Sequence, residues 1–352
     1  MRIYSDSKVS SFLSSISDDH ICTFLNEWNR KRNHRERIYI SYDSTNKNCQ
    51  AGDISIVEFG HPKEDRGLPV FNYAVAYDKT NREPLFYEEY PGSIVDVSQL
   101  QFMLEKARGY GYRNVGFILD RGYFSKGNIA YMDECGYDFV IMIKGMAGLV
   151  SGLITEHKGT FESNRACSIR SHKVYGKTVR TRLYASDAKE RYFHLYYSSA
   201  KDSAEKEEVE TKIDRMAKII SSYEMKYASF PHTFSEYFDL VYDEKQDLFL
   251  FGNERSDVIE RELGLCGYFV IVTSANMDAK EALDLYKSRD QQEKLFRGDK
   301  SYLGNRSARV HSDESISGKI FVEFVALIIR NRMYCQLRDE MEAYVGKPNY
   351  MT

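Results

Sequence analysis

The pattern of apolar and polar positions changes its period along the chain. Residues 1–36 have the 3.6-residue period of helices, with Phe24 and Trp28 on one face of the second helical segment. After this segment the pattern becomes that of strands, beginning with the alternation of residues 38–43. We therefore expect two N-terminal helices followed by a domain that is built on a sheet.

Strand and helix patterns then follow one another in an order that indicates the fold class. In chain order we predict three strands, a helix, a strand, a helix and a strand, at residues 38–43, 70–77, 83–90, 96–109, 115–119, 126–135 and 139–144. The last two strands are continuously apolar, as expected of strands that are buried on both faces. The order predicts an α/β fold with a mixed five-stranded sheet flanked by helices.

A third region has a different composition, rich in strand patterns and charged residues. We predict a hairpin, a charged helix and two further strands, at residues 180–185 and 192–198, about 200–227, 249–251 and 267–273. We interpret residues 151–278 as a β-rich insertion subdomain. The main domain would then consist of residues 37–150 and 279–346, and residues 1–36 would form a separate helical segment.

A long helix is predicted near the C-terminus, at about residues 316–344. Its apolar run, residues 320–329, is shorter than the roughly 18 residues of a membrane span and contains Glu323. We therefore expect a buried helix and no contact with a membrane. The N-terminus lacks the apolar run of a signal peptide.

The cysteine content suggests in which compartment the protein acts, and the charge distribution suggests DNA as a binding partner. The six cysteines form no C-x-x-C pair, so we expect reduced thiols in a cytoplasmic protein. The formal net charge is −3, but residues 165–182 contain six Lys or Arg and no acid, and residues 287–309 contain seven basic residues against three acidic ones. Such patches suit contacts with the phosphates of DNA, although a basic stretch is often only a solvated surface.

Polar side chains gather on one face of a predicted helix that begins after Asp278. At 100° per residue, four of them fall within an arc of about 60°: Tyr286, Arg289, Glu293 and Lys300. The ordinary alternative is a solvated helix face with an ion pair between Arg289 and Glu293. Gly298 is a candidate end of this helix before Lys300.

Three acids are candidates for metal ligands. Asp43 and Asp120 are predicted to end strands, where function gathers in sheets of this kind, and Glu293 lies on the helix. Three carboxylates that converge with no Lys or Arg between them repel one another. Two Mg²⁺ ions would remove the repulsion, activate a water molecule and stabilise the leaving oxygen of a phosphodiester. The alternative is that both aspartates only form turns.

Other chemistries have no motif in the sequence. It contains no G-x-x-x-x-G-K-[ST] loop for a nucleoside triphosphate, no H-E-x-x-H or Cys/His cluster for zinc, and no G-x-S-x-G nucleophile elbow.

The same residues resemble the catalytic region of DDE transposases of bacterial insertion sequences. The resemblance is to the group that has a Y-x2-R-x3-E-x6-K signature after a long β-rich insertion. The signature is complete here, as Tyr286, Arg289, Glu293 and Lys300. Residues 42–45 (YDST) are similar to the family's D-x-T motif, and residues 119–125 (LDRGYFS) to its D-R-G-Y-[FY]-S motif.

The resemblance implies a fold, a cofactor and an activity. It implies an RNase H-like domain in which Asp43, Asp120 and Glu293 bind two Mg²⁺ or Mn²⁺ ions. It implies DNA cleavage at element ends, followed by transfer of the freed 3′-OH into target DNA. It implies that Tyr286, Arg289 and Lys300 contact DNA, and we add Arg297 of the same helix as a further candidate for DNA contact. The partners would be transposon ends, target DNA and a second copy of the chain in a synaptic complex, with the cytoplasmic protein associated with the nucleoid when bound to DNA.

The N-terminal segment departs from the family pattern. Family members carry a longer DNA-binding region before the first acid, whereas 42 residues precede Asp43. We therefore interpret residues 1–36 as the remnant of such a region. Two alternatives stay open: a truncated, non-catalytic copy that dimerises with and inhibits a full-length one, and a stand-alone RNase H-like nuclease.

Overall fold

The structure, a computed structural model, describes most of the chain. The described residues are 4–32, 36–51, 53–60, 67–144, 146–243, 248–302, 304 and 306–343. The chain forms two compact units. The first consists of Met1–Lys144, Val272–Asn276 and Glu281–Thr352, and the second of Gly145–Ile271 and Met277–Lys280.

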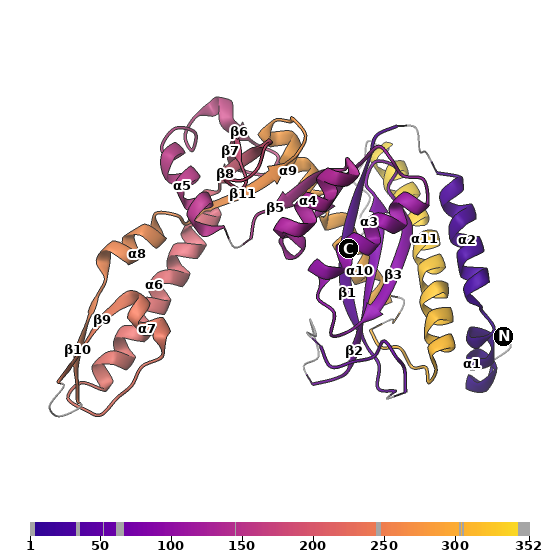
Figure 1. The fold of residues 1–352 in the computed structure, drawn as a ribbon, viewed down its shortest axis with the longest axis horizontal. Helices are drawn as coiled ribbons and strands as arrows, with labels where there is room; N and C mark the ends of the chain where they lie inside the picture. The colour runs from indigo at the N-terminus through magenta and orange to yellow at the C-terminus, as the bar shows by residue number, and fades with distance from the viewer. Residues whose placement is uncertain are drawn as a thin grey trace. The chain divides into compact units, whose positions relative to one another are not determined.

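A mixed sheet forms the centre of the first unit (Figure 1). Its strands are β1 (Ile38–Asn48), β2 (Val70–Asp78), β3 (Glu83–Pro91), β4 (Val115–Leu119) and β5 (Asp138–Met142). They lie in the order β3-β2-β1-β4-β5, with antiparallel pairing from β3 to β1 and parallel pairing from β1 to β5. The predicted fold class, an RNase H-like α/β fold with a mixed sheet, is confirmed, but the predicted number of five strands is wrong, because this sheet has nine strands in the described part of the chain.

Helices accompany the sheet of the first unit. They are α1 (Asp6–Ser14), α2 (Asp18–Arg30), α3 (Asp96–Gly109), η1 (Arg121–Tyr123), α4 (Lys126–Cys135), α9 (Ala279–Lys287), α10 (Asp290–Tyr302) and α11 (Asp313–Ala343). The predicted N-terminal helix pair, α3, α4 and the long C-terminal helix are confirmed.

Side chains alternate between the two faces of β1, and this alternation places the helices. On one face, Ser41 contacts α10 and Lys47 contacts both α10 and α11. On the other face, the ring of Tyr42 packs against that of Tyr123, and its hydroxyl bonds to Glu88. The sheet is thus covered on one face by α10 and α11.

The predicted single helix through the polar arc is wrong, because the chain breaks between α9 and α10. Local hydrogen bonds explain the break: the Ser288 hydroxyl donates to the carbonyl of Leu285 (2.6 Å), and the Arg289 N–H bonds only three residues back, to Tyr286 (3.3 Å). Such side-chain bonds compete with the helical pattern. Helix α10 then continues through Gly298 and includes Lys300.

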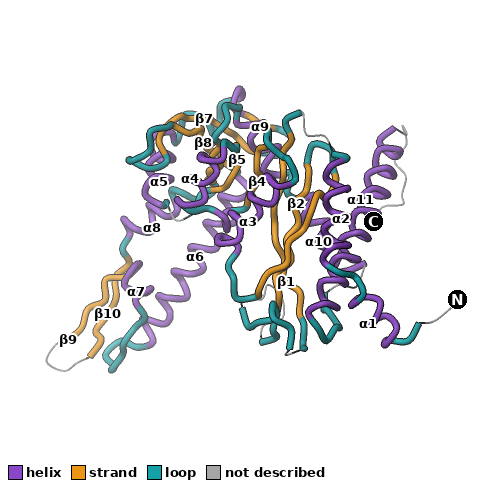
Figure 2. The backbone as a smooth tube through the Cα atoms, turned by 45° about the vertical axis from the view of Figure 1, so that its right-hand side comes forward, coloured by secondary structure: helices purple, strands orange, loops and turns teal. Residues whose placement is uncertain are grey.

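The second unit contains strands of the large sheet, a separate two-stranded sheet of β9 and β10, and helices (Figure 2). Its elements are α5 (Ala147–His157), η2 (Arg165–Cys167), β6 (Ser168–Ile169), β7 (Val174–Arg182), β8 (Glu190–Tyr197), α6 (Ser199–Ser222), α7 (His232–Tyr237), β9 (Phe238–Asp243), β10 (Leu248–Glu254), α8 (Ser256–Leu263) and most of β11 (Tyr268–Thr273). The predicted hairpin, now β7–β8, and the charged helix α6 are confirmed. Helices α5, α7 and α8 and strand β9 were not predicted.

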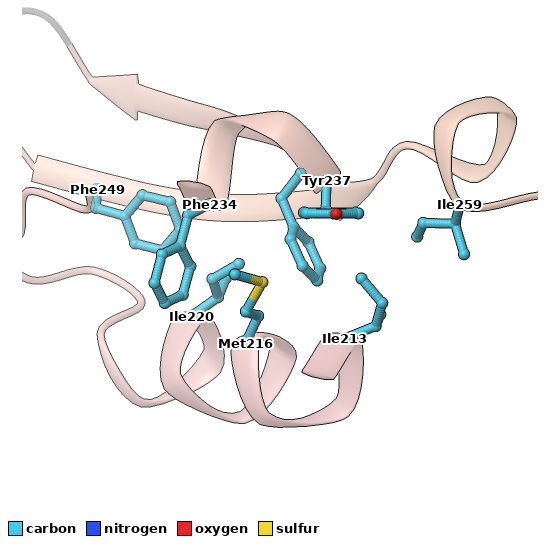
Figure 3. Packing of buried hydrophobic residues seen from close by; sticks show 8 residues of the cluster. Ile213, Met216, Ile220, Phe234, Tyr237, Phe249 and Ile259 are labelled. Carbon is cyan, nitrogen blue, oxygen red and sulfur yellow. The ribbon is translucent and has the colours of Figure 1, made fainter. Parts of the chain in front are cut away.

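A hydrophobic cluster within the second unit holds α6, α7, α8 and the strands β9 and β10 together (Figure 3). Helix α6 contributes Ile213, Met216 and Ile220, which pack against Phe234 of α7 and Phe249 of β10. These side chains recur every three or four residues along α6, so one face of this charged helix is apolar.

The six cysteines are free thiols. Among the helices in the described part of the chain, none combines the length and the apolar character that crossing a membrane requires.

Candidate active site

The two candidate aspartates lie next to each other on neighbouring strands. In the parallel pairing of β1 with β4, Tyr42 lies opposite Leu119, and Asp43 and Asp120 are the next residue on each strand. Strand β4 ends there, as predicted for Asp120. The prediction is wrong for Asp43, because β1 continues to Asn48 through its pairing with β2, where Asp43 lies opposite Val75.

Each aspartate also forms a local hydrogen bond. Oδ1 of Asp43 accepts from the N–H of Ser44 (2.9 Å), and Oδ1 of Asp120 accepts from the N–H of Arg121 (2.7 Å), which caps η1. The bond to the Arg121 N–H agrees with the alternative that Asp120 forms a turn. Each of these bonds uses one of the roughly four lone-pair sites of a carboxylate.

Arg289 lies between the two aspartates. Its Nη1 is 3.1 Å from Oδ1 of Asp120 and its Nη2 is 3.9 Å from Oδ2 of Asp43, and its side chain is only 10% exposed. The Tyr286 hydroxyl joins this group, accepting from Arg289 Nη1 (3.0 Å) and lying 3.4 Å from Asp120 Oδ1. A basic side chain therefore does lie between the two aspartates, and the ion pairs of Arg289 with described residues are to these aspartates instead of Glu293, the partner in the alternative of an ordinary helix-surface pair.

The electrostatics of this group keep Arg289 charged and Tyr286 neutral. Burial alone would lower the pKa of Arg289, but the Asp120 and Asp43 carboxylates outweigh it and raise the pKa, with a smaller contribution from Glu293. Burial raises the pKa of Tyr286 to about 12, which the positive charge of Arg289 offsets in part. At neutral pH the site therefore holds one fixed cation and one hydroxyl.

The remaining candidates lie further along α10. Glu293 is exposed, and its backbone N–H bonds to the carbonyl of Arg289 (3.1 Å), so it lies in the first turn of α10 after the break. Arg297 is exposed one turn later, and Lys300 is half-buried about two turns from Glu293. The structure thus brings Tyr286 and Arg289 to the aspartates and leaves these three side chains outside that contact group.

The donor chemistry of the site fits a hard divalent cation. Carboxylate oxygens are the ligands that Mg²⁺ and Mn²⁺ prefer, and Mg²⁺ uses one or two carboxylates together with water and substrate oxygens. The guanidinium of Arg289 already shows that positive charge is stabilised between Asp43 and Asp120. Within the described ranges, no three or more acidic, His or Cys side chains lie close enough together to hold a metal ion. A three-ligand site would therefore need the Glu293 carboxylate to approach the aspartates.

Gln292 is a site residue that the sequence did not reveal. Its side chain is fully buried, accepts from the Ser41 hydroxyl at Oε1 (2.6 Å) and donates from Nε2 to the carbonyl of Val75 (2.6 Å). It thereby ties α10, immediately before Glu293, to β1 and β2. Nothing in the sequence distinguishes Gln292 from a solvated glutamine, because its partners come from distant strands.

The chain was also compared with known proteins. A family model described as transposase DDE domain matches residues 40–329. No curated protein sequence matches. Among solved structures, a piggyBac transposase synaptic complex with hairpin DNA is 6% identical, with a TM-score of 0.46 over 93% of this chain and 52% of that chain.

Two further structures have lower TM-scores. A Mos1 mariner paired-end complex with Mn is 15% identical, with a TM-score of 0.21 over 39% of this chain and 43% of that chain. A Drosophila P element transposase strand transfer complex is 10% identical, with a TM-score of 0.19 over 96% and 81%. The chain spans about half the length of the first of these structures.

Proposed function

Since this chain belongs to the transposase DDE domain family, we propose that it cuts DNA at the ends of a mobile element and transfers the freed 3′-OH into target DNA. In the first step, water attacks the scissile phosphorus and the bond to the 3′ oxygen breaks, leaving a 3′-OH and a 5′-phosphate. In the second step, this 3′-OH attacks a phosphodiester of the target and displaces its 3′ oxygen.

One observation carries the proposal. Asp43 and Asp120 occupy adjacent positions on neighbouring parallel strands, and Arg289, on the segment that carries the third acid, contacts both. Residues from three distant parts of the chain therefore meet in the combination that the family motif contains. An ordinary turn or surface ion pair would not require this convergence.

Each residue has a proposed role. Asp43, Asp120 and Glu293 would hold two Mg²⁺ or Mn²⁺ ions, which supply an activated water and stabilise the leaving oxygen when bound. Arg289 and Tyr286 would contact a phosphate of the DNA, since a guanidinium fork and a neutral hydroxyl both donate to phosphate oxygens. Arg297 and Lys300 would contact the DNA further along α10.

The partners and domain roles are part of the same proposal. DNA would be both substrate and target, and two copies of the chain would bridge two element ends. Residues 37–150 and 279–346 would form the catalytic domain, residues 151–278 an insertion, and residues 1–36 a separate helical segment. The protein would act in the cytoplasm, associated with the nucleoid when it binds DNA.

The test is a nicking assay with a supercoiled plasmid that carries the element ends. Glu293→Gln should abolish Mg²⁺-dependent nicking and leave the circular dichroism spectrum and melting temperature unchanged, because Glu293 is exposed on α10. The matched control is Glu134→Gln, which removes an exposed carboxylate from α4 of the same unit and should nick like the wild type. Nicking by Glu293→Gln at the wild-type rate would refute the proposal.

The same assay separates the alternatives. A stand-alone nuclease would nick plasmids with and without element ends equally. A non-catalytic remnant would nick neither, and gel filtration would find it in a complex with a full-length copy.

A further inference from the structure

A pocket of about 240 Å³ lies in the first unit between the β2–β3 turn, α10 and α11. Five of the described side chains that line it are basic and none is acidic: Arg82, Lys294, Arg297, Arg330 and Arg338. Its floor includes the buried Tyr77, Leu295 and Leu327. An apolar floor below a basic rim strengthens the attraction for an anion, because the effective dielectric constant is lower there than in water.

The basic side chains are not all neutralised by the protein. Arg82 pairs with Asp339 (2.8 Å) and Arg338 with Glu342 (2.7 Å), both at the exposed rim. Lys294 and Arg297 form no ion pair with any described residue. The pocket therefore retains positive charge on the α10 side.

The wall of the pocket is held in place by α11. Arg82 has a left-handed backbone, with a φ of 56°, which is costly for a residue other than glycine. Its carbonyl accepts from Asn331 Nδ2 (2.7 Å), and Oδ1 of Asn331 accepts from the Tyr77 hydroxyl (3.4 Å). This network fixes the turn against α11 and keeps the pocket open.

The absence of a side chain at Gly298 leaves room for the guanidinium of Arg330 in the pocket. A Cβ atom added at Gly298 would lie 2.1 Å from Nη1 of Arg330, so the guanidinium lies directly against the backbone of α10. The contact is with the end of a flexible side chain. Alanine at this position would therefore displace the Arg330 guanidinium and leave the helix in place.

We propose that this pocket binds a backbone phosphate of DNA close to the phosphate at the acidic site. The proposal rests on the proposed function and adds a second anchor for the same strand. Helix α10 carries both places: Arg297 is four residues after Glu293, about 5–6 Å away between Cβ atoms. Consecutive phosphates of one strand are separated by more than the axial rise of about 3.4 Å, because the backbone winds around the helix axis, so this distance is that of about one nucleotide. A strand held at the acids thus reaches the pocket with a neighbouring phosphate.

The experiment measures binding of the full chain to a fluorescein-labelled duplex that carries an element end, by anisotropy, in EDTA and over a range of salt. Lys294→Gln with Arg330→Gln should weaken binding about 10-fold at low salt and reduce the slope of log affinity against log salt by about 1, the loss of one phosphate contact. The matched control, Arg108→Gln with Arg113→Gln, removes two exposed charges from α3 and from the loop that follows it and should keep the wild-type slope.

Gly298→Ala provides a second, independent variant. It should weaken binding in the same direction while the melting temperature stays at or above that of the wild type, because alanine favours the helix. The pocket proposal is overturned if the pocket pair and the control pair bind equally. It is also overturned if inorganic phosphate binds the wild type by calorimetry and not the pocket pair while their DNA affinities match, since the pocket would then be a free-anion site.

The outcome also separates this proposal from the proposed function. If the wild type nicks in Mg²⁺ and the pocket pair binds DNA normally, only the pocket proposal fails. If the wild type binds no duplex, the proposed function fails with it.

Discussion

Lys47 of β1 and Asp299 of α10 form an ion pair in the interior of the first unit, with Nζ 2.7 Å from Oδ2 and both side chains 1% exposed. Lys47 also pairs with Glu323 of α11 (2.7 Å). Since Lys47 shares a strand face with Asp43, and Asp299 shares a helix with Glu293, this contact fixes the strand of the first acid against the helix of the third.

Replacing Lys47 with methionine should strongly destabilise the first unit. The variant leaves two carboxylates buried with no ammonium between them, and breaking a buried pair in this way costs about 3–5 kcal/mol. Burial already raises the pKa of Glu323, so the folded variant binds protons more readily than the unfolded chain. Part of the lost stability should therefore return as the pH falls from 7 to 5.

Urea unfolding at the two pH values measures this effect. The control is Arg30→Met, which removes one partner of the exposed Arg30–Glu27 pair and should be nearly neutral. Equal stability of Lys47→Met and the wild type at pH 7 would contradict the importance of the buried pair.

Gln292→Ala tests whether Gln292 positions α10 at the site without taking part in metal binding. It leaves the Ser41 hydroxyl and the Val75 carbonyl without their buried partner, which costs about 1–3 kcal/mol. Because α10 would then be held less firmly, we expect slower nicking with little change in the Mg²⁺ concentration needed for half-maximal rate.

The control for this variant is Gln336→Ala, which removes an exposed glutamine from α11 and should affect neither quantity. A purely structural role for Gln292 would leave the nicking rate of the folded protein at the wild-type value.

Arg289→Met should make the metal-free protein less stable and more responsive to Mg²⁺. The guanidinium neutralises Asp43 and Asp120, and a hydrogen bond to a charged group contributes about 1.5–3 kcal/mol, towards the lower end here because Asp120 is 40% exposed. A divalent cation would replace the missing charge, so Mg²⁺ should raise the melting temperature of the variant more than that of the wild type.

Scanning calorimetry in EDTA and in Mg²⁺ measures both effects. Arg289→Lys, which keeps a positive charge, should lie between the two proteins, and Arg289→Met with Asp43→Asn should lose the Mg²⁺ response. An equal Mg²⁺ shift in the wild type and Arg289→Met would indicate that Arg289 does not lie where cations bind.

The second unit should lose stability in mild acid through His194. This side chain is fully buried on β8 and hydrogen-bonded to Thr178 (2.9 Å); burial lowers its pKa to about 4, against a smaller opposing effect of Asp278. Between pH 6.5 and 4 the unfolded chain binds the proton and the folded unit does not. The free energy of unfolding of this unit therefore decreases as the pH is lowered. From pH 7 to 5 the loss is about 2 kcal/mol.

Hydrogen exchange of the β7 and β8 amides measures this loss within the second unit. His194→Gln removes the titrating group and should show about 2 kcal/mol less loss over the same range. His232→Gln, a change at an exposed histidine, should retain the wild-type pH dependence. A wild-type dependence in His194→Gln would assign the effect to other groups.

The sequence by itself determined the strands β1 to β5 of the first unit and their order along the chain. Periodicity located the sheet strands of the first unit, because burial on both faces makes β4 and β5 continuously apolar and leaves an alternating pattern in β1. The order of the three motifs identified Asp43, Asp120 and Glu293 as candidates, because each motif consists of residues close together in the sequence and can be recognised without the structure.

Only the tertiary structure decided how these residues meet. The adjacency of Asp43 and Asp120 depends on the register between β1 and β4, which pairs residues more than 70 positions apart. The break before α10 turns Arg289 towards both aspartates, where uniform helical geometry would have aligned it with Glu293. Partners such as Lys47 and Asp299, or Gln292 and Ser41, are likewise chosen by packing across the sheet. Periodicity reports which face of an element is buried, and it carries no information on which distant side chain lies opposite.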